Sequence, residues 1–319
     1  MNKVDSRNRW LLVIVAVLSA ATAWTGELTT PSSRSSSSGN NGTEAGGVRP
    51  FPGYYHDLAF YGFANQKDEF HRNRYVSELD LSMDYRIFSV GERSTLLWDL
   101  ALMTGMGEAR DSHLPFASYE IAYRLGPWFE YVRNDRLYRI GWDHGCSHLV
   151  HKDGPHPWYE DASGNPLLSD VYYNRAFVGY GTPWIRPQVY RERAAADPDA
   201  RRRWGPSAWY FEAGYYLRSF FDIIDQGSLY EGNDWAWDAR AEWRYPVRVG
   251  RSFVLSLTNE ARVLLDTGAS TYWTDRCGLE AWFTGGALGT GLFIRGSLID
   301  EHPRDSKDRI IEAGLRVFL

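Results

Sequence analysis

Cysteine is scarce in this 319-residue sequence: there are two, too few for a disulfide framework, and no CxxC pair or Cys/His zinc spacing occurs. Long apolar runs are also rare. Because a membrane-spanning helix needs about 20 consecutive apolar residues, a polytopic helical membrane protein is excluded. The formal net charge of −5 shows no excess of basic residues, which argues against nucleic acid as a partner. Aromatic residues are abundant, with 14 Trp, 20 Tyr and 15 Phe, which argues against disorder.

The one long apolar stretch spans residues 10–23, follows basic residues and ends on small ones. These features predict a secretory signal peptide at 1–23, with a membrane-anchoring helix as the alternative. No cysteine directly follows the stretch, so a lipoprotein anchor is excluded. Residues 24–50 are rich in Ser and Gly and predict a flexible linker.

From residue 75 onward apolar and charged residues alternate with period 2, for example in 78–87, 118–125, 234–244 and 311–319. One face of each segment therefore suits oil and the other water. A soluble sandwich also alternates, but its strands are usually about 5 or 6 residues long, whereas these run to about 10 to 15, enough to cross a bilayer when tilted. The pattern predicts that 51–319 form a closed antiparallel transmembrane β-barrel of about 12 strands.

The expected strands leave short links at 248–250 and 285–286, which suit the periplasmic side, and mostly long links on the other side. Two inner links are longer than usual, at 106–115 and at 182–206, the second with a possible helix at 193–204. The strands are expected at 54–65, 75–89, 93–105, 116–133, 136–150, 169–181, 207–220, 233–247, 251–266, 275–285, 287–298 and 308–319.

The chain ends in Val317-Phe318-Leu319, which resembles the carboxy-terminal signal of outer-membrane barrels. This resemblance implies the bacterial outer membrane as location and the barrel-assembly machinery as partner. Inward arginines and carboxylates can pair in the lumen, so we expect a barrel whose lumen is closed, with a narrow diffusion channel as the alternative.

The candidate reactive side chains lie mostly in one expected strand, 136–150. Its alternation places Asp143 and Ser147 toward the lumen and His144, Cys146 and His148 toward lipid. Polar groups on a lipid face are costly and indicate function. Residues i and i+2 of a strand are neighbours on one face, so His144 could accept a proton from Cys146, the more readily ionised nucleophile.

An orienting residue should come from the next strand, 169–181. Across this pair, the numbers of directly opposed residues should sum to roughly 319. Asn174 would then lie beside His144 or Cys146, on the same face. Its amide could fix the tautomer of the imidazole, as a catalytic triad requires.

The run HGCSH at 144–148 resembles the His-x-Ser-Ser-His signature of a family of bacterial outer-membrane barrel proteins of unknown function. Over three residues and the barrel plan it is also similar to outer-membrane phospholipase A and the lipid A deacylase, whose catalytic residues lie on the barrel exterior. The phospholipase resemblance implies His144 as base, Cys146 as nucleophile, Asn174 as orienting residue, calcium as cofactor and outer-membrane lipids as substrates. The sequence departs from both lipases at Cys146, where they have Ser, and no Asn-Gly follows.

A lipid acyl hydrolase is therefore one hypothesis, with Ser147 and His148 as alternative site residues. A non-enzymatic structural or binding barrel is the other, since Cys146 and Cys277 could be small apolar residues and His148 an amphipathic side chain at the headgroup level.

Whether a metal binds also stays open. His144 and His148 share one strand face, and two ligands do not make a site. Further imidazoles and carboxylates follow in the next link, at His151, Asp153, His156 and Glu160. The substrate and the oligomeric state are open as well.

Overall fold

The structure is a computed structural model that describes residues 48–64, 76–91, 93–107, 117–134, 136–149, 170–182, 208–217, 235–249, 253–283, 289–301 and 309–318. The predicted signal peptide and most of the predicted linker lie outside these residues, so both stay predictions. None of the helices among the described residues is long and apolar enough to cross a membrane.

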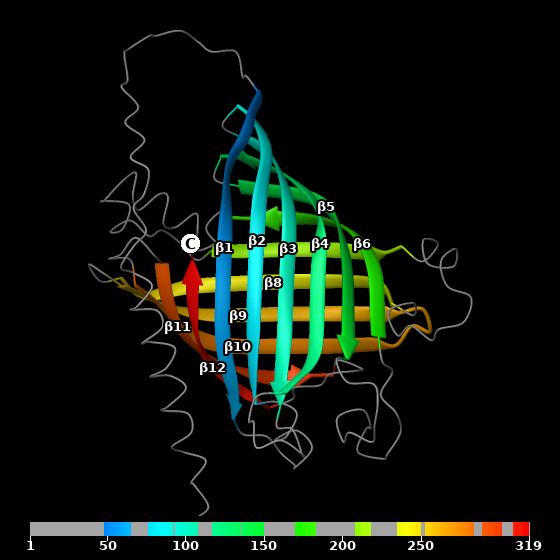
Figure 1. Cartoon of the computed structure of the whole chain (residues 1–319), viewed down its shortest axis with the longest axis vertical. Coiled ribbons are helices and arrows are strands. Elements are labelled where there is room, and N and C mark those ends of the chain that lie inside the picture. The colour runs from blue at the N-terminus through cyan, green and yellow to red at the C-terminus, as the bar shows by residue number, and fades with distance from the viewer. Residues whose placement is uncertain are drawn as a thin grey trace, which may run out of the picture. The chain divides into compact units, whose positions relative to one another are not determined.

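Twelve antiparallel strands form a closed barrel in which each strand pairs with its sequence neighbours and β1 pairs with β12, which confirms the predicted fold. In Figure 1 the first strands cross the near side and β8 to β10 cross the far side at a steep angle to them, as tilted barrel strands do. The strands are β1 (Val48–Ala64), β2 (Ser77–Val90), β3 (Ser94–Gly107), β4 (Ala117–Arg133), β5 (Arg136–Leu149), β6 (Asp170–Gly181), β7 (Ala208–Tyr216), β8 (Trp235–Val249), β9 (Phe253–Asp266), β10 (Thr271–Phe283), β11 (Gly289–Asp300) and β12 (Ile311–Phe318).

Several strand ends differ from the predicted ones. β1 begins at Val48, before the barrel boundary expected at residue 51, because its first residues pair with β2 across a register shift that breaks the alternation. β10 begins at Thr271 because the preceding link is a tight turn, in which the backbone N–H of Ser270 donates to Asp266 Oδ1 (2.7 Å). β7 ends at Tyr216, earlier than expected.

The links alternate between the two barrel ends because neighbouring strands run in opposite directions. The link between β3 and β4 therefore lies at the same end as the link between β5 and β6, and the prediction that 106–115 is an inner link is wrong. The long inner link and its expected helix at 193–204 lie outside the described residues.

Two short links at the opposite end use residues that tolerate a left-handed backbone. Gly91 follows β2 with φ of 61°, and Asn134 follows β4 with φ of 51°. Gly and Asn adopt this conformation at lower cost than other residues. Since short turns mark the periplasmic end of such barrels, this end is the inner one.

The barrel exterior is apolar. Ile140, Val178 and Leu298 each expose 57% of their surface, and Trp237 and Trp273 each expose 53%. Such a surface is stable against lipid, where the closed ladder satisfies the backbone hydrogen bonds of every strand.

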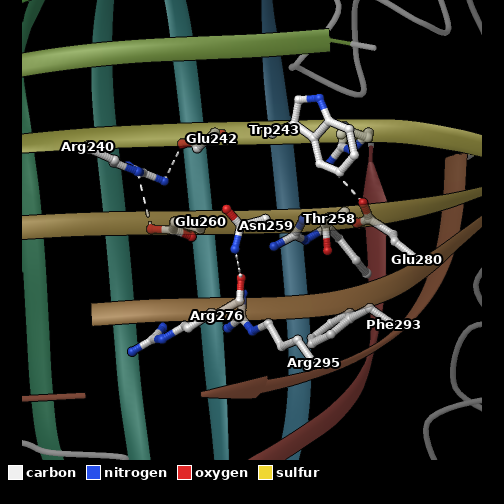
Figure 2. A pocket seen from close by; sticks show the side chains of 12 residues that line it. Arg240, Glu242, Trp243, Thr258, Asn259, Glu260, Arg276, Glu280, Phe293 and Arg295 are labelled. Carbon is white, nitrogen blue, oxygen red and sulfur yellow. Dashed lines mark hydrogen bonds and ion pairs between the residues drawn. The ribbon is translucent and has the colours of Figure 1, made fainter. Parts of the chain in front are cut away.

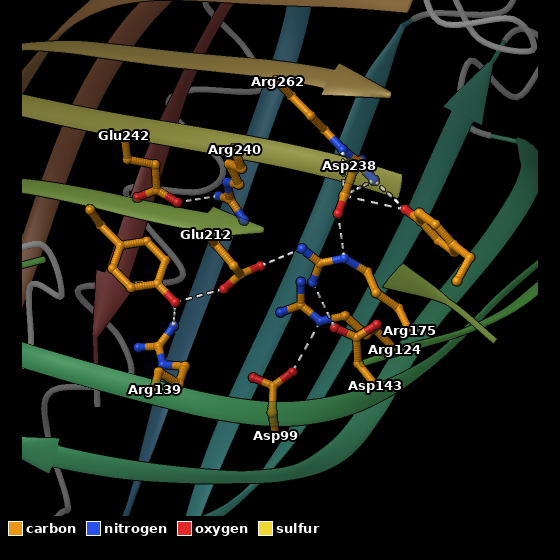
Figure 3. A network of polar contacts seen from close by, with 12 residues as sticks. Asp99, Arg124, Arg139, Asp143, Arg175, Glu212, Asp238, Arg240, Glu242 and Arg262 are labelled. Carbon is orange, nitrogen blue, oxygen red and sulfur yellow. Dashed lines mark hydrogen bonds and ion pairs between the residues drawn. The ribbon is translucent and has the colours of Figure 1, made fainter. Parts of the chain in front are cut away.

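The interior carries the charge. Arg175 of β6 donates from Nη1 to Asp143 of β5 (3.2 Å), from Nη2 to Glu212 of β7 (2.8 Å) and from Nε to Asp238 of β8 (2.8 Å). Figure 3 shows this guanidinium among the three carboxylates. The predicted pairing of inward charges is confirmed here and in further pairs: Arg124 with Asp99, Arg139 with Glu130 and Arg240 with Glu242.

Apolar side chains fill the lumen beside this network. Leu97, Trp128 and Phe177 form a buried cluster, with the rings of Trp128 and Phe177 edge to face at 5.4 Å. Gly141 lies against the same cluster, where a Cβ atom would lie 2.6 Å from the ring of Phe177. The backbone of β5 can approach these rings only because this residue has no side chain.

Replacing Arg175 with Met should destabilise the barrel by about 3 to 5 kcal/mol, because it leaves three buried carboxylates without their shared cation. The measurement is equilibrium urea unfolding of the refolded protein in lipid vesicles. Arg133→Met removes the same charge from an exposed position at the end of β4 and should change the unfolding free energy little. Equal losses in both variants would contradict the central role of Arg175.

Candidate functional site

The candidate site lies on the outward face of β5. Tyr138 and Ile140 are exposed to the exterior, whereas Arg139 and Asp143 are buried on the lumen side. By the same alternation His144, Cys146 and His148 point outward, as predicted. We call the following residues the outer-wall cluster: Tyr123 of β4, His144, Cys146 and His148 of β5, and Tyr172 and Asn174 of β6.

His144 and Asn174 are directly opposed across β5 and β6. Their numbers sum to 318, one less than expected, so the predicted neighbourhood is confirmed. Nδ1 of His144 lies 3.2 Å from Oδ1 of Asn174. Because an amide oxygen only accepts hydrogen bonds, this assignment requires the proton on Nδ1 and makes Nε2 the basic nitrogen of a neutral imidazole.

Cys146 lies two residues beyond His144 on the same face. Its backbone partners are Tyr123 on β4 and Tyr172 on β6, and its own surface is only 3% exposed. It forms no disulfide, in line with the distance between the strands of the two cysteines. The thiol thus lies next to the candidate base but is covered in this conformation.

His148 is held differently. The hydroxyl of Tyr123 lies 3.0 Å from its Nε2 and that of Tyr172 lies 3.3 Å from its Nδ1. Both rings also contact the imidazole, at centroid distances of 5.4 and 5.1 Å. Both nitrogens of His148 are thus bonded to phenols. Sequence reasoning did not include these tyrosines in the site: period 2 places them on the outward faces of their strands but does not place them opposite His148.

The residues between the outward side chains face the lumen. Ser147 Oγ donates a hydrogen bond to Glu120, so this hydroxyl lies on the opposite side of the sheet from His144. Gly145 pairs with Tyr173, and a Cβ atom on Gly145 would lie 2.1 Å from the tyrosine ring. The glycine in the His-Gly-Cys run therefore makes room for a lumen side chain.

The aromatic side chains give the depth of the cluster. Near the inner end, Tyr138 packs against Tyr131 at 6.1 Å and Tyr180 at 5.1 Å, as an interfacial belt would. From Tyr138 to His148 the strand rises about 33 Å at about 3.3 Å per residue, and a tilt near 40° reduces this to roughly 25 Å, the height of the apolar band. His148 therefore lies at the outer interface, Cys146 about 5 Å below it and His144 about 10 Å below it.

A second polar group of outward residues lies on β9 and β10, where Cys277 was expected to be only a small apolar residue. Nδ2 of Asn259 lies 2.6 Å from Asp275 Oδ1 and 3.0 Å from Cys277 Sγ. The alternating pattern of β9 offered a signal, because Asn259 is polar on a face whose neighbours Leu257 and Ala261 are apolar. These contacts include the carboxylate of Asp275 but no imidazole.

Metal binding finds little support in the described residues, among which no group of three or more His, Cys, Asp or Glu could hold an ion. Calcium takes about six to eight oxygen ligands, often carboxylates. The described side chains of the outer-wall cluster offer imidazole, thiol, phenol and one amide, whose oxygen contacts His144. This donor set does not fit calcium. The loop residues His151, Asp153, His156 and Glu160 lie outside the described residues.

No protein-family model matches the sequence, and no curated protein is similar to it. Solved structures resemble the fold. Outer-membrane phospholipase A from Escherichia coli has 10% identity and a TM-score of 0.43 over 88% of this chain and 94% of that one. An outer-membrane channel from Pseudomonas putida F1 has 11% identity and a TM-score of 0.43 over 88% of this chain and 99% of that one. LpxR from Salmonella typhimurium has 10% identity and a TM-score of 0.40 over 83% of this chain and 100% of that one. These likenesses concern the barrel fold and have no bearing on activity.

A closed antiparallel barrel with an apolar exterior and a charged lumen belongs to the class of transmembrane β-barrels. The chain is an integral β-barrel protein of the bacterial outer membrane. Membership of the barrel family of unknown function rests on the run at 144–148 and stays a prediction.

The two faces of β5 should be distinguishable by thiol labelling in vesicles, with both native cysteines replaced by Ala. Ile140→Cys should react with a membrane-soluble maleimide and resist a charged methanethiosulfonate, because residue 140 faces lipid. Ser147→Cys should show the reverse, since residue 147 lines a lumen cavity. Preferential labelling of Ile140→Cys by the charged reagent would mean that the register is shifted by one residue.

Proposed function

We propose that this barrel is a lipid acyl-ester hydrolase whose active site lies on its exterior, with His144 as general base, Cys146 as nucleophile and Asn174 as orienting residue. The observation that carries the proposal is the 3.2 Å contact between Asn174 Oδ1 and His144 Nδ1, because it directs the basic nitrogen away from the amide. The depth of Cys146, about 5 Å below the outer interface, supports an outer-leaflet lipid as substrate, since the ester of such a lipid lies just inside the headgroup level.

The reaction would run in two steps. Nε2 of His144 takes the thiol proton, and Cys146 Sγ attacks the ester carbonyl carbon. The bond from that carbon to the alcohol oxygen breaks, the oxygen takes the proton from His144, and the lyso-lipid leaves a thioester on Cys146. A water molecule, deprotonated by His144, then attacks the thioester, which releases the fatty acid and returns the thiol.

The remaining residues of the run have other roles in this scheme. His148, bonded to Tyr123 and Tyr172, is a positioning residue at the headgroup level. Ser147 points to the lumen and takes no part. Calcium, implied by the phospholipase resemblance, enters no step because the described donor set does not suit it.

A structural barrel is the second candidate function, and the burial of Cys146 favours it. A cysteine packed among aromatic side chains behaves as a small apolar residue. In the hydrolase scheme the thiol must become accessible when lipid binds, whereas in a structural wall it stays covered. Outer-membrane lipids are the partners in both cases, and the barrel-assembly machinery stays a predicted partner.

Substitutions in the run separate these candidates. His144→Ala and Cys146→Ala should each lower release of fatty acid by about 100-fold or more, because each removes a group that transfers a proton or forms the intermediate. Asn174→Ala should lower the rate by at least about tenfold, and Cys146→Ser should retain part of it. The measurement is mass analysis of acyl chains released from phospholipid and lipid A vesicles by refolded protein.

Ser147→Ala is the matched control for these variants, since it removes a hydroxyl from the lumen side of the same strand and should stay within about twofold of the parent. Loss of activity in Ser147→Ala, with His144→Ala unaffected, would move the chemistry to the lumen. No release by the parent protein would leave the structural barrel as the function.

Calcium chelation should leave hydrolysis unchanged, because the cluster holds no described carboxylate to bind the ion. The assay above, run in excess EGTA and then with calcium restored, gives the rate ratio, which should be near one. A loss in EGTA that calcium reverses would contradict the calcium-free scheme.

A further inference from the structure

Two cavities lie inside the barrel, of about 140 and 590 Å³. They share a stretch of lining formed by residues of β8 to β12: Arg240, Glu260, Arg276, Arg295 and Arg316. Four positive charges therefore meet one negative charge where the cavities adjoin. Figure 2 shows Arg240 between Glu242 and Glu260, with Arg276 and Arg295 on the neighbouring strands.

The ion pairs of the lumen are arranged unequally. In five of them the arginine side chain exposes 20% to 34% of its surface, whereas its carboxylate partner exposes only 1% to 4%. In each of these pairs the carboxylate is buried and the guanidinium group is exposed to the cavity. These pairs are Arg124 with Asp99, Arg262 with Asp238, Arg276 with Asp300, Arg295 with Glu312, and Arg316 with Glu280.

Seven acidic residues line the two cavities, as many as the arginines, but four of them are buried: Glu78, Glu120, Glu280 and Asp300. Glu260 is exposed to 36% and Glu242 to 25%, and both pair with Arg240. Asp80 is partly buried and accepts a hydrogen bond from Tyr61 (3.1 Å). Because most of these carboxylates are buried, the guanidinium groups are the more exposed of the charged groups in the cavities, although the lumen as a whole has mixed charge.

Arg276 is the least satisfied of these cations. Its ion pair with Asp300 spans 3.6 Å, and its Nε has no hydrogen-bond partner among the described residues. A buried donor without a partner costs free energy that a bound acceptor would recover. Guanidinium groups bind tetrahedral oxyanions with two parallel hydrogen bonds, so phosphate is the chemistry that suits this surface.

We propose that the lumen binds a phosphate-type oxyanion, free or carried by a small solute, at the surface formed by Arg240, Arg276, Arg295 and Arg316. The larger cavity lies within the range of about 300 to 1,000 Å³ that small-molecule sites occupy. The anion would neutralise the guanidinium groups that the buried carboxylates leave facing the cavity. This site lies on the opposite side of the sheet from the outer-wall cluster and does not depend on the proposed hydrolysis.

The test is isothermal titration of the full-length protein, refolded in detergent, with inorganic phosphate or glucose 6-phosphate, against chloride at the same ionic strength. Both phosphates should bind and chloride should not. Tighter binding of the sugar phosphate would identify the ligand as a phosphorylated solute, and tighter binding of inorganic phosphate would identify the ion itself. Equal heats with chloride would overturn the proposal.

Arg276→Met should weaken phosphate binding at least tenfold, while Arg133→Met, at an exposed position outside the lumen, should leave it unchanged. Arg276→Lys keeps a cation beside Asp300 if the first variant fails to fold. It should still weaken binding severalfold, because an ammonium group cannot bind with two parallel hydrogen bonds. Undiminished binding in Arg276→Lys and Arg276→Met would overturn the assignment of the site.

Discussion

The ion pair between Arg175 and Asp143 fixes the part of the barrel on which the rest depends. Arg175 also binds Glu212 and Asp238, so one guanidinium joins β5, β6, β7 and β8 inside the lumen. Buried charges of this kind cost desolvation and are weak evidence of net stability. Their effect is on register, because a shift by one residue would turn Arg175 toward lipid and remove the cation that Asp143, Glu212 and Asp238 share.

The same register determines the outer surface. Asn174 precedes Arg175 and must point outward when Arg175 points inward, and His144 follows Asp143 in the same way. The contact between Asn174 and His144 is therefore a consequence of the ion pair on the other side of the sheet. In lipid an unpaired imidazole or amide would be costly, so each of these groups satisfies the other. The pair of β5 and β6 thus places charged side chains toward the lumen and the polar groups of the candidate site toward the membrane.

The faces of β5 and β6 could be predicted from the sequence, because the alternation of side chains with period 2 is a local property of each strand. The alternation around His144 and Arg175 sufficed to assign faces, and the length of the link between the strands gave the pairing to within one residue. The contacts of His148 could not be predicted in the same way, since they depend on the register of β4 as well as that of β6. The burial of Cys146 also needed three strands at once. The start of β1 at Val48 was missed because its pairing shifts register.

The identity of residue 146 accounts for how the proposed nucleophile can lie covered in an apolar wall. A serine hydroxyl needs a hydrogen-bond partner when buried, whereas a thiol is a weak donor and acceptor that packs like an apolar group. Burial of Cys146 is thus compatible with both a structural wall and a site that opens to lipid. The two imidazoles are bonded in different ways. The nitrogens of His148 both bond to phenols, as an interfacial side chain in a structural role would arrange them. His144 instead has Nδ1 bonded to the amide of Asn174, which satisfies both groups in lipid and also gives the imidazole the orientation that the proposed hydrolase scheme requires.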